Sequence, residues 1–265
     1  MSMIDNPKAP RVRRVAALAR KKDRLAAGQF LVEGPQAVRE LLVHAPGAAI
    51  AVYATMGREP WQFEIDRLAD EAEAEVVRVS DEVLAAMAET VQPQGVLAVA
   101  RIEHTPIEAA FASAKLVAVL HAVRDPGNAG AVLRAADAAG ADAVVFAGES
   151  IDPWHPKVVR STTGSMFHLP VVTAGQLADV VDAARAHGLA VIAADVNGDE
   201  LQAGDTSLSN PTAWVFGNEA RGLSEADRDL ADRAVRLPIY GKAESLNLAT
   251  AASVCLYTTA FRQRS

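Results

Sequence analysis

Three loops in the second half of the chain are richer in glycine, asparagine and proline than a simple turn requires. The first polar loop contains Asn128 and Gly130, and Arg134 follows one helical turn later. The second polar loop, residues 217–223, places an Asn-Glu pair and an arginine between two glycines, and the third spans residues 237–247. Such loops offer carboxylate, amide, guanidinium and backbone groups to a polar ligand. They are the candidate site.

Each loop by itself also has a simple structural explanation. Asn128 and Ser245 are suitable caps for the helices expected after them, and the charged side chains could simply be solvated. The first loop lacks the G-x-G-x-x-G spacing of dinucleotide-binding sites, which disfavours a dehydrogenase. Only the order and spacing of all three loops together make the pattern specific.

The elements that must position these loops alternate between short apolar runs and segments of helical periodicity, which is typical of an α/β protein. In the second half we expect strands at 116–123, 143–147, 169–172, 190–194, 212–216 and 234–237 and helices at 129–139, 157–163, 176–187, 224–231 and 247–261. Strands that are almost wholly apolar indicate a mainly parallel sheet with helices on both faces. Ligands bind such sheets at the carboxyl ends of the strands, where the polar loops begin.

The first half predicts a smaller α/β unit. We expect helices at 35–43, 61–73 and 80–89 and strands at 49–54, 75–79 and 95–102. Ser80 is the expected N-cap of the third helix, because acidic residues follow it in the first turn. Residues 103–114 lose strand character and contain Pro106, so we place the boundary near residue 108.

Taken together, the polar loops resemble the three motifs of the SpoU/TrmH-type RNA ribose 2′-O-methyltransferases, a trefoil-knotted class of AdoMet-dependent enzymes. The matching patterns are N-x-G-x-x-x-R at 128–134, G-N-E-x-x-G-L at 217–223 and L-P-x-x-G-x-x-x-S-L-N at 237–247, and the resemblance covers about 116–257. Residues 30–34 and the helix after them are similar to the start of the family's small N-terminal RNA-binding domain. Members with this layout include the thiostrepton-resistance rRNA methyltransferases.

The resemblance implies a fold and a division of the chain. The C-terminal part would be a parallel-sheet α/β domain with a C-terminal trefoil knot, and the N-terminal part a small α/β RNA-binding domain of ribosomal-protein type. We expect a basic arm or helix at 1–28, an RNA substrate-binding domain at 29–107 and a SpoU-type methyltransferase domain at 108–265.

The resemblance also implies an activity: methyl transfer from S-adenosyl-L-methionine (AdoMet) to a ribose 2′-hydroxyl of RNA, with 23S rRNA favoured, by a homodimer and without a metal. Catalytic roles would fall on Arg134, Asn128, Glu219, Ser245 and Asn247. Contacts to AdoMet would fall on Ala194, Gly217, Leu237, Ile239 and Leu246. The alternatives are a tRNA substrate and a catalytically silent RNA-binding or ribosome-assembly factor, which AdoMet binding would distinguish from an enzyme.

Two of these residues are candidates for handling the ribose hydroxyl. A guanidinium is hardly ever deprotonated in proteins, so we expect Arg134 to bind the phosphate beside the target ribose rather than to act as a base. Glu219 is then a candidate proton acceptor.

The net charge of −7 conceals an asymmetry. Residues 8–24 carry eight basic side chains against Asp23, a local charge of +7, which leaves −14 on the rest of the chain. A basic segment on an acidic body favours a contact with RNA, DNA or a membrane, although a solvated helix face has the same composition. With RNA as the implied partner, the candidate RNA-binding residues are Arg11, Arg13, Arg14, Arg20, Lys21 and Lys22.

Composition excludes several other classes of protein. Half of the residues are apolar and 22% are charged, which is enough for a packed core. No apolar run approaches the roughly 20 residues of a membrane helix, and no apolar stretch follows the basic N-terminus to form a signal peptide. The single cysteine, Cys255, excludes an intramolecular disulfide and a cysteine-cluster metal site. We expect a soluble, cytoplasmic protein with no membrane partner.

Overall fold

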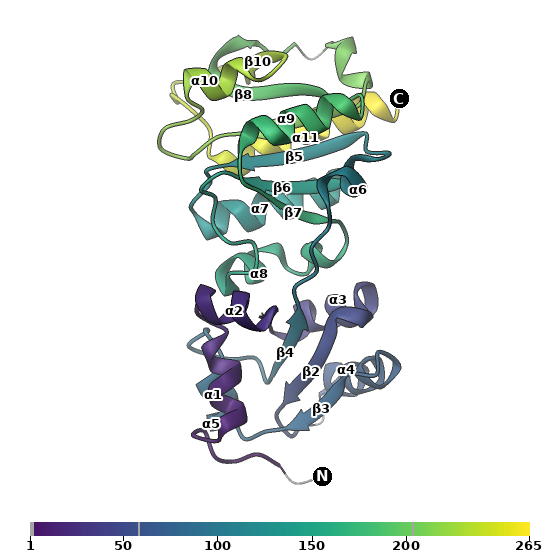
Figure 1. The fold of residues 1–265 in the computed structure, drawn as a ribbon, viewed down its shortest axis with the longest axis vertical. Helices are drawn as coiled ribbons and strands as arrows, with labels where there is room; N and C mark the ends of the chain where they lie inside the picture. Colours follow the sequence, from purple (N-terminus) through teal and green to yellow (C-terminus); the bar gives the residue numbers. More distant parts are fainter. Residues whose placement is uncertain (1–2, 58, 203) are drawn as a thin grey trace. The chain divides into compact units, whose positions relative to one another are not determined.

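The computed structural model describes residues 3–57, 59–202 and 204–265. They form two compact units (Figure 1). The first contains the residues up to Glu103 together with Trp154–His168, and the second contains His104–Pro153 and Leu169–Ser265. The first unit therefore includes the segment Trp154–His168. This segment lies inside the range 108–265, which we predicted to be one continuous domain.

The second unit is built on a six-stranded sheet in the order β10-β8-β9-β5-β6-β7, with every neighbouring pair parallel. Its strands are β5 (Leu116–His121), β6 (Ala143–Ala147), β7 (Val171–Ala174), β8 (Ala190–Glu200), β9 (Thr212–Phe216) and β10 (Arg233–Arg236). Every residue of β6 and β9 is buried, which explains why these strands carry almost no polar side chains. The predicted parallel-sheet α/β fold is confirmed.

Helices cover both faces of this sheet. They are α6 (Ile107–Phe111), α7 (Pro126–Ala139), α9 (Leu177–Ala186), α10 (Glu225–Asp229) and α11 (Leu248–Gln263), with a 3-10 turn η3 (Thr206–Ser209). Val117 and Val119 of β5 pack with α6 and α9 in one core cluster. On the other face α7 and α11 pack together over β5 and β9, and the Trp214 indole N–H donates to Thr259 Oγ1 at 2.9 Å. The short helix α6 is absent from the sequence prediction.

Two helix starts differ from the prediction. Asp125, not Asn128, caps α7: its carboxylate accepts the Asn128 backbone N–H at 2.7 Å, so Asn128 lies in the first turn. Asn247, not Ser245, caps α11 by accepting the N–H of Ala249 at 2.9 Å. The first correction leaves the side chain of Asn128 available for other contacts. No helix in the described part of the chain is long and apolar enough to cross a membrane.

The first unit contains a four-stranded mixed sheet in the order β1-β4-β2-β3. β4 is antiparallel to β1 and β2, and β3 is parallel to β2. The strands are β1 (Gln29–Glu33), β2 (Ala49–Ala54), β3 (Glu75–Arg78) and β4 (Val96–Arg101). The helices are α1 (Pro10–Ala17), α2 (Lys21–Ala27), α3 (Pro35–His44), α4 (Pro60–Glu71), α5 (Asp81–Met87) and α8 (Pro156–Thr162), with 3-10 turns η1 (Pro46–Ala48) and η2 (Ser165–Phe167). As expected, Ser80 caps α5 by accepting the Val83 N–H at 3.3 Å.

The basic N-terminal segment is part of this unit. Val12 and Val15 of α1 and the adjoining Leu18 are buried in one cluster with α5 and the sheet. Arg24 is only 1% exposed and donates from Nη1 to the carbonyl oxygens of Leu18 and Ala19 at 2.9 and 2.7 Å. The segment thus combines exposed basic side chains with a buried apolar face.

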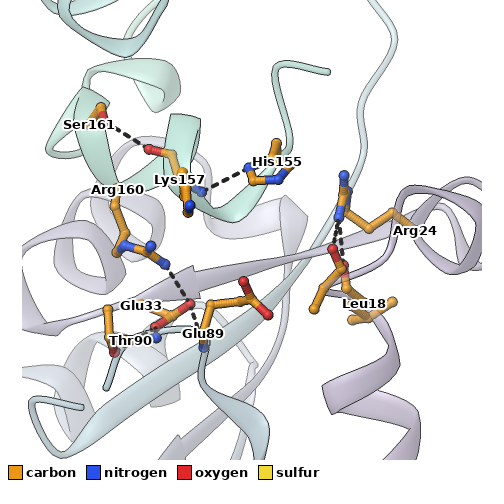
Figure 2. Close-up of polar contacts among 10 residues, drawn as sticks. Leu18, Arg24, Glu33, Glu89, Thr90, His155, Lys157, Arg160 and Ser161 are labelled. Carbon is orange, nitrogen blue, oxygen red and sulfur yellow. Dashed lines mark hydrogen bonds and ion pairs between the residues drawn. The ribbon is translucent and has the colours of Figure 1, made fainter. Parts of the chain in front are cut away.

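A buried ion pair fastens α8 to the first unit (Figure 2). Arg160 Nη1 lies 3.0 Å from Glu33 Oε1, and the Glu33 side chain is 5% exposed. The same carboxylate accepts the backbone N–H groups of Glu89 and Thr90 at 3.1 and 3.2 Å and the Thr90 hydroxyl at 2.9 Å. Four donors satisfy this carboxylate, so removing one leaves a buried charge poorly compensated.

Arg160→Ala should lower the free energy of unfolding by about 2 kcal/mol, because Glu33 keeps its buried charge but loses its cation. Chemical denaturation followed by circular dichroism measures the change. Arg67→Ala is a matched control, since Arg67 and Glu71 are 59% and 58% exposed and should contribute less than about 0.5 kcal/mol. Equal effects of the two substitutions would contradict a structural role for the buried pair.

Candidate active site

The first and second polar loops meet at the carboxyl ends of β5 and β9. These strands are parallel neighbours, so the chain leaves both at the same edge of the sheet. The Glu219 carboxylate accepts the backbone N–H groups of Arg124 at 3.2 Å and Asp125 at 2.9 Å. The Asn218 side-chain amide donates to the Ala122 carbonyl oxygen at 2.9 Å. The Asn-Glu pair therefore orders the first loop by binding its backbone.

The third polar loop joins this cluster through Asn247. Its Nδ2 donates to Asn128 Oδ1 at 2.9 Å, while Asn128 Nδ2 lies 3.4 Å from Glu219 Oε1. One hydrogen-bonded line, Glu219–Asn128–Asn247, thus connects residues that stand far apart in the sequence and come from all three loops. Three of the five predicted catalytic residues are brought together in this line.

The other two predicted catalytic residues stand apart from it. Arg134 is exposed on α7 and does not line the cavity that lies where the first two loops meet. Ser245 is exposed in the third loop and caps no helix. Within the described residues of one chain, the structure therefore does not assemble all five groups. The exposed guanidinium of Arg134 remains available to an external anion.

A cavity of about 820 Å³ lies where the first two loops meet. Asp125, Asn128, Glu219 and Arg221 contribute to its lining, and its volume is suitable for a nucleotide-sized ligand. The lining also includes His121, which the sequence analysis did not select. Its Nε2 lies 3.4 Å from an Asp227 carboxylate oxygen. The sequence signal that could have identified His121 is its position as a polar residue at the end of the otherwise apolar strand β5.

Four of the five residues expected to contact AdoMet follow a strand directly or lie in the third loop: Gly217, Leu237, Ile239 and Leu246. The fifth, Ala194, lies within β8 and not at its end, because the strand continues to Glu200 instead of stopping at residue 194 as predicted. Ala194 is paired with Phe216, the last residue of β9, and Gly217 comes directly after it. A Cβ on Gly217 would lie 2.5 Å from the Gly222 carbonyl carbon, so only glycine allows this close approach of two backbone segments.

The third loop has the surface that a nucleoside cofactor requires. In the described part of the chain, residues 237–246 form no helix or strand and make no backbone hydrogen bond. Ile239 and Leu246 are 37% and 40% exposed. Free backbone donors and acceptors beside exposed apolar side chains suit an adenine ring and its ribose, so these residues fit AdoMet.

The six predicted RNA-binding residues fall into two groups. Arg11 makes two hydrogen bonds to the Glu75 carboxylate, at 2.9 and 2.5 Å, and lies over the Tyr53 ring at 5.2 Å. The hydrogen bond raises the pKa of Arg11 and lowers the pKa of Glu75. Arg20 is bonded to Asp23 at 2.6 Å. The second group is exposed and makes no ion pair with any described acidic side chain; it contains Arg13, Arg14, Lys21 and Lys22.

Comparison with known proteins accounts for the three loops. Residues 115–257, which contain all of them, match the SpoU rRNA methylase family. This chain belongs to that family. Residues 9–98 match the MRM3-like substrate binding domain. The predicted family resemblance is therefore confirmed, and both parts of the chain have counterparts among known proteins.

Relatives within the SpoU family match nearly the whole chain. Bacillus subtilis RlmP, named 23S rRNA (guanosine(2553)-2′-O)-methyltransferase, is 35% identical over 258 residues, which cover 97% of this chain and 98% of RlmP. A Streptomyces viridochromogenes 23S rRNA (uridine(2479)-2′-O)-methyltransferase is 34% identical over 261 residues, covering 94% and 88% of the two chains. The structure of the SpoU methyltransferase AviRb from Streptomyces viridochromogenes with the cofactor AdoMet superimposes with a TM-score of 0.83 at 32% identity, covering 97% and 99%.

Proposed function

We propose that this chain transfers a methyl group from AdoMet to a ribose 2′-hydroxyl of 23S rRNA in the cytoplasm. The observation that carries the proposal is the line Glu219–Asn128–Asn247, which joins the three SpoU motifs. Two of its members, Asn128 and Glu219, line a nucleotide-sized cavity. Relatives named as 23S rRNA 2′-O-methyltransferases over nearly the full length support the substrate class. Two such relatives are named for different nucleosides, guanosine and uridine, so the proposal concerns the 2′-hydroxyl that both nucleosides carry.

The protein's task in this reaction is mainly alignment. AdoMet supplies a methyl group activated by a positively charged sulfur, whereas a ribose hydroxyl is a weak nucleophile that must be placed in line with it. An exposed guanidinium such as Arg134 can bind the neighbouring phosphate with two charge-assisted hydrogen bonds and so place the hydroxyl. Gly217 and the third loop bind the cofactor through backbone groups.

Glu219 serves as a positioning residue in this proposal rather than as the proton acceptor, and the proton of the ribose hydroxyl passes to solvent water as the oxygen–methyl bond forms. Both of its carboxylate oxygens already accept a backbone N–H, from Arg124 and Asp125. A base must accept the hydroxyl proton on an available lone pair, and binding to two amides favours the role of holding the first loop. Asn128 and Asn247 likewise act by holding the three loops in position relative to one another.

A homodimer with a knotted C-terminal segment completes the proposal. Val254, Tyr257 and Phe261 of α11 are 43%, 38% and 69% exposed and share one helix face. An exposed apolar stripe of this kind suits an interface between two copies. A second copy seated on α11 would also explain why Arg134 stands outside the cluster of its own chain, since it could serve the partner's cavity.

Methyl transfer from tritiated AdoMet to unmethylated 23S rRNA and to bulk tRNA tests the proposal. Label is expected in 23S rRNA at a single ribose, resistant to alkaline cleavage at that position. Label in tRNA alone would establish the tRNA alternative. AdoMet binding without transfer to either RNA, or no AdoMet binding at all, would favour the silent RNA-binding factor.

The exposed basic residues of α1 and α2 should supply phosphate attraction. Replacing Arg13, Arg14, Lys21 and Lys22 together by glutamine should weaken rRNA binding and reduce the slope of log affinity against log salt by about 3. AdoMet affinity should not change. Glutamine substitution preserves the buried face of α1, which a deletion of residues 8–24 would destroy.

The control for this variant removes a pair that is already neutral. The double variant Arg11→Gln/Glu75→Gln abolishes one guanidinium and its bound carboxylate, so the salt slope should stay at the wild-type value. An unchanged slope in the fourfold variant would mean that this basic surface only aids solubility.

A further inference from the structure

We propose that Glu40, His44 and His168 form a binding site for a divalent transition-metal ion of the Zn²⁺ type. Each residue offers one ligand atom, and the three atoms lie within 4.8 Å of one another. All three residues belong to the first unit, whereas the candidate active site belongs to the second. The proposal therefore concerns a site separate from methyl transfer.

Two elements aim these ligands at one point. Glu40 and His44 are four residues apart in the last turns of α3, so their side chains project from the same face. His168 follows η2 at the end of the segment Trp154–His168. His44 Nε2 lies 3.2 Å and His168 Nε2 lies 3.0 Å from the same oxygen, Oε2 of Glu40. The two imidazole rings are 4.5 Å apart between centroids.

The carboxylate at the centre is buried and oriented. The Glu40 side chain is 9% exposed, and Gly164, at φ +101°, lies so close that a Cβ there would be 2.4 Å from Glu40 Cγ. Oε1 accepts hydrogen bonds from Gln36 Nε2 at 2.7 Å and Arg39 Nη1 at 3.0 Å. These partners direct Oε2 toward the two histidines, in the way that hydrogen bonds fix the carboxylate ligands of known metal sites.

The donor set selects the class of ion. Two imidazole nitrogens and one carboxylate oxygen suit Zn²⁺, Co²⁺ or Ni²⁺, while Mg²⁺ and Ca²⁺ prefer oxygen ligands. Binding requires each imidazole to carry its proton on Nδ1 and to present Nε2 to the ion instead of donating to Glu40. His44 is 46% exposed and can adjust, and water can complete the coordination. The charge of Arg39 weakens such a site, so moderate affinity is expected.

A bound ion would link the end of α3 to the end of the segment Trp154–His168. The Arg160–Glu33 pair fastens the same segment through α8 and β1. The metal would thus stabilise the first unit at a second point along this segment. Its effect is expected on stability, and methyl transfer should proceed without it.

The test is equilibrium dialysis of metal-free full-length protein against zinc chloride, with bound zinc measured by mass spectrometry. One ion per chain is expected. His168→Gln and His44→Gln retain polar side chains of similar size but lose a ligand, and each should weaken zinc binding by more than about 100-fold. Gln36→Leu, which removes one of the two hydrogen bonds to Oε1 of Glu40, should weaken it by about tenfold. His104→Gln removes an exposed histidine elsewhere and should bind zinc as the wild type does.

A measurement on the wild type keeps the proposal testable if a variant misfolds. Zinc-edge X-ray absorption should show two imidazole nitrogens bound to the ion, and zinc should raise the unfolding temperature. Zinc binding that is absent from the wild type would overturn the proposal. So would binding that survives both histidine substitutions, or an absorption spectrum without imidazole ligands.

Discussion

Arg134→Ala should reduce methyl transfer to 23S rRNA by about 10³-fold while AdoMet affinity stays at the wild-type value. The guanidinium is exposed on α7 and contributes nothing to the cavity lining or to the third loop, so its loss should spare the cofactor. Arg134→Lys keeps the positive charge but not the planar pair of donors, and an intermediate rate is expected.

Single-turnover transfer of tritiated methyl groups measures the rate, and calorimetry measures AdoMet affinity. Near-normal turnover in Arg134→Ala would remove this residue from the mechanism. A parallel loss of AdoMet affinity would show instead that Arg134 supports the cofactor site.

Mixing inactive variants tests whether two copies share the site. A heterodimer of Arg134→Ala and Glu219→Ala has one cavity that can receive an intact Arg134 from the partner and keep its own Glu219. Activity should therefore reappear when the two variants are co-expressed. Continued inactivity in a verified heterodimer would place Arg134 and Glu219 in the same chain's site.

Glu219→Ala should reduce methyl transfer by about 10²-fold, through the loops rather than through proton transfer. The substitution removes the acceptor for the N–H groups of Arg124 and Asp125 and a neighbour of Asn128. Hydrogen exchange at the amides of Arg124 and Asp125 should therefore accelerate. A residue that served only as a base would leave those amides protected.

Glu219→Gln separates the two roles further. Its amide oxygen can still accept one backbone N–H, so a positioning residue should keep part of its effect, whereas a base would be lost as completely as in Glu219→Ala. Glu244→Ala is the control, because Glu244 is an exposed carboxylate in the third loop with no hydrogen bond in the described structure. It should transfer methyl groups at the wild-type rate.

Several strands could be predicted from local sequence because most of their residues are buried and apolar. The observed bounds of β2, β6 and β9 agree with the predicted ranges, since each is a short apolar run whose ends lose hydrophobicity. By contrast, β8 extends to Glu200, well past the apolar run that ends at Ala194, because pairing with β10 supports polar residues as well. Helix caps were misassigned because several neighbouring residues had suitable side chains and only backbone geometry distinguishes them.

The sequence by itself determined the α/β class, the three motifs and the excess of basic residues near the N-terminus. Only the tertiary structure decided which of those residues act together. It joined Glu219, Asn128 and Asn247, committed Arg11 to Glu75, and brought His168 to Glu40 across 128 positions of sequence. The physical reason is that a periodic pattern records which face of an element is buried, whereas a contact between distant elements depends on how sheets and loops close in space.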